Sequence, residues 1–403
     1  MALFKNEKVR NAFYLGVLCS VAYFGVYVVR NVLSTVTPKM IEDGFTNEYI
    51  GEASSLFFIF YAVGQLINGI IGDKIKARYM LSLGLVLAGA LNFAFPFLTV
   101  IQQMALYAYG ISGFFLAMIY GPMTKVISEN TEHIYAARCS LGYNFASYIG
   151  SPVAGVMAAV MTWQSVFYVS SGALIVLAVL VFVFFLMFEK RGIVKYNQFK
   201  AVSEKKGGSI MVLIKNDIIK FTIVSVLTGI IRTTVVFWLP TYIAQYLGFS
   251  SEASVSIYTV ATLVISLNAF VAIFVYERLK RNMDLTMLIS FIVSALSFVV
   301  AYAFKQPILN IFFIVLAILA SNCATTMLWS IYCPSLRDTG MVSGATGYLD
   351  FMSYMAASIS SVIFANAVAD IGWGNLRLVW AALAACGVLL TLPYKKFVKR
   401  NNA

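Results

Sequence analysis

Apolar runs of about 20 residues recur along the whole chain, and they restrict its fold more than any other feature of the sequence. A run of this length suits an α-helix that crosses the hydrocarbon core of a bilayer, whereas barrel strands show about 10 residues of alternating hydrophobicity. Hydrophobic residues make up 61% of the chain and charged residues 11%, and the mean hydropathy is +0.85. These values exclude an ordinary soluble domain and predict an all-α integral membrane protein.

Twelve such runs can be separated by short polar turns, and each is expected to form one transmembrane helix. The charged start is followed directly by a run long enough to span, so no cleavable signal peptide is expected. The predicted helices cover residues 12–36, 50–71, 79–100, 104–127, 138–160, 164–188, 218–246, 253–276, 286–304, 308–332, 344–368 and 377–394.

A long basic segment, 189–217, divides the runs into six and six. We therefore expect an N-terminal six-helix bundle over 1–188, a cytoplasmic basic linker over 189–217 and a C-terminal six-helix bundle over 218–403. With both termini cytoplasmic, most of the 29 Lys and Arg residues fall at cytoplasmic helix ends, as the positive-inside rule requires. The net charge of +12 is thus explained by topology and by contact with anionic lipid, and no nucleic-acid partner is expected.

The two halves of the sequence resemble each other. Arg30 is followed eight residues later by a proline, and Arg232 repeats this spacing 202 residues further along the chain. Each proline is followed by a Gly-Phe turn and then a hydroxyl residue. A second echo joins "GYNFASY" at 142–148 to "GYLDFMSY" at 347–354. The sequence thus predicts two pseudo-symmetric bundles, and in transporters built from such repeats the substrate site lies at the interface of the halves near mid-bilayer.

Arg30 and Arg232 are the two basic residues that fall deep inside predicted helices. A charge at this depth costs roughly 2.5–3.5 kcal/mol even on gentle insertion scales, so it usually marks a functional site. The planar guanidinium donates two parallel hydrogen bonds and stays protonated, which suits it to phosphate and other oxyanions. We expect the two side chains to face one central cavity and to bind a small anionic substrate there.

Polar residues at helical spacing extend this candidate site. Tyr23, Tyr27 and Arg30 share one face of the first helix, and Tyr61 and Gln65 share one face of the second. These faces are expected to point away from lipid, either toward the cavity or toward neighbouring helices as interhelical hydrogen bonds. The full set of substrate-binding candidates is Arg30, Arg232, Tyr23, Tyr27, Tyr61, Gln65, Asn144, Ser147, Asp350 and Tyr354.

Asp350 stands at the position in the repeat that matches Asn144, and several interpretations of its role are open. It could pair with Arg30 or Arg232 in the empty protein, couple transport to protons, or recognise a substrate amine or hydroxyl. The structural alternative is an acid near the interface that reaches water. An intramembrane carboxylate favours the functional readings.

Other classes of function lack their motifs. No phosphate-binding loop of the form GxxxxGK[ST] is present, so ATP-driven transport is not expected. No group of His, Cys, Asp or Glu has the spacing of a metal site or a nucleophile, so neither an enzyme, a metal nor a cofactor is predicted.

The pattern Gly69-x-x-x-Asp73-Lys74-x-Lys76-x-Arg78 resembles the signature loop of the major facilitator superfamily. Within that superfamily the chain resembles the organophosphate:phosphate antiporters, which include glycerol-3-phosphate and hexose-phosphate exchangers. The residues that carry this resemblance are "YVVR" (27–30), "EDGF" (42–45), "YGPMTK" (120–125), Asn144 and "RTTVVFWLPTY" (232–242).

The resemblance implies a fold, a function and roles for residues. It implies the twelve-helix major facilitator fold, exchange of an organic phosphate for inorganic phosphate by alternating access, and two arginines, at Arg30 and Arg232, that grip the phosphate. Asp73 and Arg78 are expected to form a conformational lock on the cytoplasmic side.

This chain lacks the helix-11 lysine of the hexose-phosphate carriers, where "SYMAAS" (353–358) stands, and it departs from the antiporter pattern at three further places. Gln65 stands where the glycerol-phosphate carriers have lysine, Ser147 stands where they have histidine, and Asp350 is additional. The alternatives are therefore a proton-coupled symporter of another anion, or a non-transporting sensor of sugar phosphates. We expect a monomer in a cell inner membrane with both termini cytoplasmic.

Overall fold

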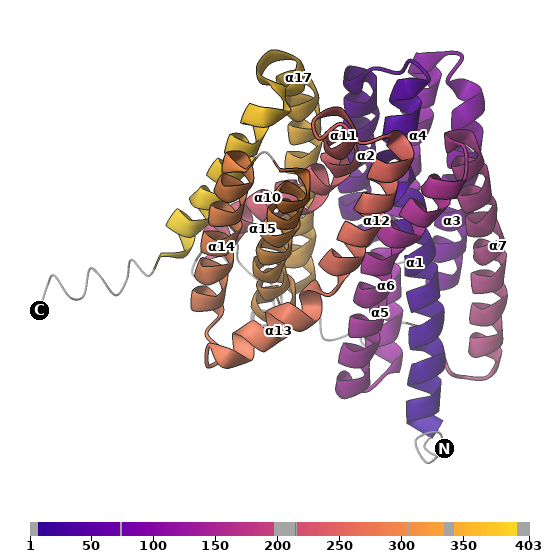
Figure 1. Ribbon diagram of the computed structural model, residues 1–403. Coiled ribbons are helices and arrows are strands. Elements are labelled where there is room, and N and C mark those ends of the chain that lie inside the picture. Colours follow the sequence, from indigo (N-terminus) through magenta and orange to yellow (C-terminus); the bar gives the residue numbers. More distant parts are fainter. Residues whose placement is uncertain are drawn as a thin grey trace, which may run out of the picture. The chain divides into compact units, whose positions relative to one another are not determined.

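The computed structural model describes residues 7–72, 75–196, 214, 216–304, 306–333 and 342–392, and every regular element among them is helical. The first half contains α1 (Glu7–Glu42), α2 (Asn47–Gly72), α3 (Ala77–Leu98), α4 (Gln102–Leu116), α5 (Tyr120–Asn130), α6 (His133–Val160) and α7 (Trp163–Lys190). The second half contains α10 (Ile218–Gly229), η2 (Ile230–Val235), α11 (Val236–Gln245), α12 (Ser251–Ser266), α13 (Asn268–Arg278), α14 (Met283–Ala303), α15 (Pro307–Met327), η3 (Leu328–Tyr332) and α17 (Val342–Thr391). Figure 1 shows the order of these elements.

The described helices account for the twelve predicted spans. Ten stretches are long and apolar enough to cross a membrane. One of them, α17, merges two helices across Gly372, whose φ of 71° is not helical, and these correspond to the predicted spans 344–368 and 377–394. The remaining span is α6, which has a shorter apolar part at Phe145–Val160. The prediction of an all-α multi-pass membrane protein is therefore confirmed.

Two predicted helices are interrupted where the sequence analysis expected continuity. The span predicted at 104–127 breaks between α4 and α5, because Pro122 has no N–H and its ring clashes with the carbonyl four residues earlier, at Met118. The span predicted at 253–276 breaks between α12 and α13, at Leu267. Helix α14 begins at a side-chain cap, since the side chain of Asn282 accepts a hydrogen bond from the backbone N–H of Leu285 at 3.0 Å.

The repeat predicted from the sequence is visible in the turns that follow the two proline-containing helices. Gly44 and Gly248 both adopt the left-handed conformation, with φ of 95° and 76°. The hydroxyl residue of each turn then caps the next helix, since Thr46 Oγ1 accepts from the N–H of Tyr49 at 3.2 Å and Ser250 Oγ accepts from the N–H of Ala253 at 3.3 Å. The two copies thus use the same turn chemistry.

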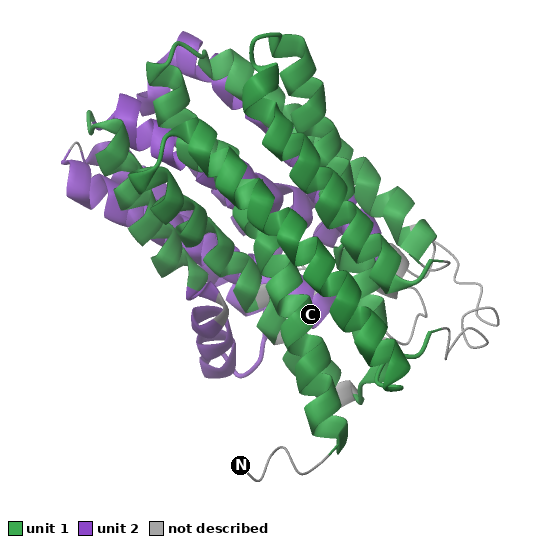
Figure 2. Ribbon diagram, turned by 90° about the vertical axis from the view of Figure 1, so that its right-hand side faces the viewer, with its two compact units in different colours: residues 1–207, 248–266 green, residues 208–247, 267–403 purple. Residues whose placement is uncertain are grey.

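The chain packs into two compact units, coloured separately in Figure 2. The first comprises residues 1–207 and 248–266, and the second comprises residues 208–247 and 267–403. Helix α12 therefore packs with the first unit, against α6 and α1. It is joined there by a hydrogen bond between Ser151 and Tyr258 at 3.0 Å, and by another from Ser251 to Glu42.

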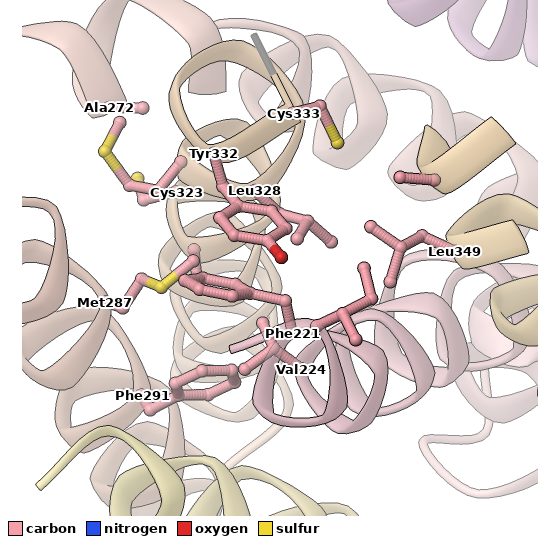
Figure 3. Close-up of a cluster of buried hydrophobic side chains, with 14 residues drawn as sticks. Phe221, Val224, Ala272, Met287, Phe291, Cys323, Leu328, Tyr332, Cys333 and Leu349 are labelled. Carbon is pink, nitrogen blue, oxygen red and sulfur yellow. The ribbon is translucent and has the colours of Figure 1, made fainter. Parts of the chain in front are cut away.

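Each unit has its own core. In the first, the rings of Phe57, Phe95 and Phe167 surround Tyr109, and the Phe95 and Phe167 centroids are 4.7 Å apart. In the second, Phe221 of α10 stacks on Tyr332 of η3, with Met287, Phe291 and Leu349 around the pair (Figure 3). These packing units group α12 with the first half of the chain. The boundaries predicted for the two bundles and the linker remain predictions.

Candidate functional site

Arg30 lies in the middle of α1 and is partly buried. Its Nη1 donates a hydrogen bond to the hydroxyl of Tyr27 at 3.4 Å, and the hydroxyls of Tyr23 and Tyr27 are 3.5 Å apart. The three residues therefore occupy one face of the helix, as their spacing predicts.

Aromatic rings from two helices surround this guanidinium. Its central carbon lies 5.1 Å from the ring centroid of Tyr27 on α1, and 5.0 Å and 5.9 Å from those of Tyr61 and Phe58 on α2. Cation–π contacts of this kind contribute about 0.5–2 kcal/mol each, depending on exposure to water. The faces of these rings contact the guanidinium and shield part of it from water.

Tyr23 also belongs to a second group of packed aromatic rings. The ring centroid of Tyr23 lies 5.6 Å from that of Tyr120 on α5 and 5.8 Å from that of Tyr143 on α6. The sequence analysis did not select Phe58, Tyr120 or Tyr143. Local signals were present for all three: Phe58 precedes Tyr61 by three residues, Tyr143 precedes Ser147 by four, and Tyr120 opens the "YGPMTK" motif.

The other candidates of the first unit are placed on α2 and α6. Gln65 follows Tyr61 by one turn and is partly buried, and Ser147 on α6 is 8% exposed. Asn68, a turn beyond, donates to the backbone carbonyl of Phe114 at 3.1 Å and so joins α2 to α4. The side chain of Asn144 lies outside the described residues.

Arg232 lies in η2, a turn of π-helix between α10 and α11. Its Nη2 donates to the hydroxyl of Tyr354 on α17 at 3.5 Å. Nearby, Thr234 donates to the carbonyl of Ala357 at 3.1 Å and shares a 2.8 Å hydrogen bond with Ser360. Single π-turns inside α-helices occur frequently at functional sites.

Asp350 precedes Tyr354 by four residues on α17, so the carboxylate and the hydroxyl share one face of that helix. Asp350 is partly buried. The structure thus brings the predicted residues together in two groups, one around Arg30 in the first unit and one around Arg232 in the second. That the two groups meet at one cavity remains a prediction.

Arg78, predicted to form a lock with Asp73, is buried and pairs with Glu189 at the end of α7, with 2.8 Å between Nη1 and Oε2. Its Nη2 also donates to Tyr79 Oη at 2.7 Å. Asp73 lies outside the described residues, so its pairing with Arg78 stays a prediction.

The same carboxylate fastens the segment that follows α7. Glu189 accepts a hydrogen bond from Tyr196 at 2.9 Å. Burial, together with this hydrogen bond, raises the pKa of Tyr196. Glu189 was not selected from the sequence, because it lies 111 residues from Arg78.

No group of His, Cys, Asp and Glu that could hold a metal ion occurs within the described part of the chain. What the described site offers instead is two partly buried guanidinium groups with tyrosine hydroxyls beside them. This chemistry suits recognition of an oxyanion.

A family model described as Major Facilitator Superfamily matches residues 19–361, and the chain belongs to this superfamily. It is 24% identical to the glycerol-3-phosphate transporter of Bacillus subtilis (strain 168), over 62% of this chain and 60% of that protein. It is 23% identical to the phosphoglycerate transporter protein of Salmonella typhimurium (strain LT2), over 93% of this chain and 87% of that protein.

Among solved structures, the chain resembles the crystal structure of a D-xylose-proton symporter, with a TM-score of 0.76 and 12% identity over 94% of this chain and 97% of that one. At this identity the likeness shows the fold alone. The matched family and the named relatives are transporters, which confirms the recognised superfamily and the expectation that the chain is not an enzyme.

Proposed function

We propose that the protein is a secondary transporter that exchanges an organic phosphate for inorganic phosphate by alternating access in a bacterial inner membrane. The observation that carries this proposal is the setting of Arg30, a partly buried cation with the hydroxyl of Tyr27 at 3.4 Å and three aromatic rings within 6 Å. The names of the relatives, which are transporters of glycerol-3-phosphate and phosphoglycerate, support a phosphorylated organic substrate.

In the proposed mechanism, Arg30 and Arg232 bind one phosphate group from opposite halves of the chain. Two forked cations neutralise a dianion, and the tyrosines beside them, Tyr27 and Tyr354, offer hydroxyls to its oxygens. The organic part of the substrate then meets Tyr61, Gln65, Asn144 and Ser147. The site needs no cofactor.

The two charges also explain why the transporter would exchange anions rather than carry them one way. Closing both gates around an empty site strands two arginine charges away from water, at a cost of several kcal/mol each. A bound dianion offsets most of that cost, so the loaded form crosses between its two states and the empty form does not.

The test is transport by the purified protein in proteoliposomes. Vesicles loaded with phosphate should take up labelled phosphate, and vesicles without a counter-anion should not. Arg30→Lys and Arg232→Lys should each lower the exchange rate at least 100-fold, because lysine keeps the charge but not the bidentate geometry. Uptake into anion-free vesicles at the wild-type exchange rate would refute the exchange mechanism.

The substrate is best found by the same assay run in competition. Glycerol-3-phosphate, 3-phosphoglycerate, hexose phosphates and phosphoenolpyruvate would be compared with plain carboxylates. Inhibition of phosphate self-exchange by carboxylates alone would overturn the organophosphate assignment.

The placement of Asp350 favours a second candidate function, a proton-coupled symporter of an anion. Asp350 shares a face of α17 with Tyr354, which accepts from Arg232. A carboxylate that neutralises Arg232 would let the empty carrier return, and its protonation would couple flux to pH. Uptake driven by an imposed pH gradient, and abolished by Asp350→Asn, would select this function over exchange.

A further inference from the structure

A groove of about 690 Å³ runs between α1 and α6 of the first unit, away from the residues considered so far. It is lined along α1 from Val9 to Phe24 and along α6 from Tyr135 to Ile149. Its lining is almost wholly apolar, with Ser20, Tyr135 and Arg138 as the residues that carry polar side-chain atoms.

Small residues create the groove. A Cβ on Gly16 would lie 2.6 Å from the sulfur of Cys139, and a Cβ on Gly142 would lie 3.1 Å from Ser20 Oγ. The two helices therefore approach closely, and no bulky side chain fills the seam between them. Phe13 and Phe145 stand beside this seam and are 50% and 40% exposed.

The groove is distinct from the Arg30 site. On α1, the groove is lined by residues between Val9 and Phe24, and neither Tyr27 nor Arg30 is among them. A ligand of the groove thus contacts the part of α1 that lies N-terminal to Tyr27 and Arg30.

One end of the groove is cationic. Arg138 in the second turn of α6 is exposed, and its guanidinium lies 5.9 Å from the ring centroid of Tyr135. Among the described residues, no carboxylate forms an ion pair with it, and the nearby Glu132 is already bonded to Lys8 at 2.8 Å. The positive-inside pattern puts this end at the cytoplasmic surface.

We propose that the groove binds an acyl chain of an anionic phospholipid, with the lipid phosphate on Arg138. The lining from Val9 to Phe24 rises about 22 Å along α1, which is long enough for an acyl chain that crosses the half of a ~30 Å hydrocarbon core belonging to one leaflet. The cytoplasmic leaflet holds the anionic lipids that such a cation attracts. Charge, apolar lining and length thus agree on one occupant.

The first test is lipid retention by the purified full-length protein, measured by native mass spectrometry with equal amounts of phosphatidylglycerol, phosphatidylethanolamine and phosphatidylcholine. The wild type should retain phosphatidylglycerol at least 5-fold over the other two lipids. Arg138→Gln should abolish that preference. The matched control Arg10→Gln, at the same end of α1 but outside the groove, should keep it. Equal preference in Arg138→Gln and the wild type would overturn the proposal.

A second pair of variants tests the acyl chain. Ala146→Phe places a ring in the groove and should reduce retention of every phospholipid, whereas Val156→Phe adds the same ring at an exposed position of α6 outside the groove and should not. Loss of lipid from both variants alike, or from neither, would contradict an acyl chain in the groove.

A third measurement applies even where Ala146→Phe fails to fold. A tryptophan introduced at Val21, in the groove, is compared with one at Val176, an exposed position on α7. Brominated phosphatidylglycerol should quench the groove tryptophan more than brominated phosphatidylcholine does, and the excess should vanish with Arg138→Gln. An equal quenching ratio at both positions refutes a specific site.

Discussion

At the scale of single residues, Arg377 and Arg30 are held inside the protein by different contacts. Arg377 is 2% exposed and donates to the carbonyls of Gly374 and Ala301, at 3.2 and 2.6 Å, and to the hydroxyl of Tyr246, at 2.6 Å. Each nitrogen of its guanidinium thus has an acceptor, and these hydrogen bonds join α17 to the ends of α14 and α11. Arg30 is less buried: it donates to the hydroxyl of Tyr27 at 3.4 Å, and its guanidinium lies over the rings of Tyr27 and Tyr61.

Arg377→Met should destabilise the fold by about 1–3 kcal/mol, because it leaves the buried carbonyl of Ala301 without its donor. The thermal unfolding midpoint in detergent measures the change. Arg191→Met, at an exposed position after α7, serves as the control and should leave the midpoint unchanged. A midpoint for Arg377→Met equal to that of the control would show that the cluster contributes nothing.

Tyr61→Phe and Tyr61→Leu separate the ring from the hydroxyl. The ring centroid lies 5.0 Å from the Arg30 guanidinium, so phenylalanine retains the cation–π contact and leucine removes it. On the proposed function, Tyr61→Leu should weaken phosphate binding by about 1 kcal/mol more than Tyr61→Phe does. Calorimetric titration with phosphate measures both, and equal losses would mean that the ring plays no part.

At the scale of helices, close approach depends on glycine at a few positions. A Cβ on Gly155 of α6 would lie 2.0 Å from the side-chain oxygen of Thr259 on α12. Both helices belong to the first unit, and Ser151 and Tyr258 bond across the same seam at 3.0 Å. The stretch of α6 that ends at Gly155 therefore brings two backbones together where a larger residue would separate them.

Gly155→Ala should destabilise the α6–α12 contact by about 1–3 kcal/mol through overpacking. Adding Thr259→Ala removes the obstructing oxygen and should recover part of that loss, which a double-mutant cycle on unfolding midpoints would detect. Strict additivity of the two changes would show that the residues do not oppose each other.

Some features of these helices can be predicted from the sequence, and others cannot. The spans follow from hydropathy, because backbone groups in lipid must bond within their own helix. The grouping of Tyr23, Tyr27 and Arg30 follows from helical spacing alone. The partner of Arg78 did not follow, since Glu189 comes from a distant helix end and only tertiary packing selects it.

The π-turn at Arg232 was also beyond the sequence pattern. Pro38 and Pro240 stand at equal distances from their arginines, yet α1 is continuous and the second copy contains η2. The two stretches also differ in composition. The stretch "IIRTTVV" is β-branched at every position except the arginine, and such residues crowd the α-helical turn.

At the scale of the whole molecule, the distribution of Lys and Arg predicts that both termini are cytoplasmic. A fluorescent protein fused after Ala403 should therefore fluoresce in cells, and alkaline phosphatase fused at the same place should be inactive. A fusion after Gly44, in the turn after α1, should give the opposite pair of results. The reverse outcome at Ala403 would invert the topology and move the cationic end of the α1–α6 groove to the other leaflet.

Because of the π-turn, the helices that carry the two arginines of the proposed anion site differ in local geometry. Arg30 projects from an unbroken helix, whereas η2 holds one residue more per turn than the helices on either side of it. A return to α-helical bonding would swing the side chains before the turn by about 100° relative to those after it. If one phosphate is shared by both guanidinium groups, Arg30 binds it from a fixed position. A small backbone rearrangement in η2 can then move Arg232 away from the phosphate.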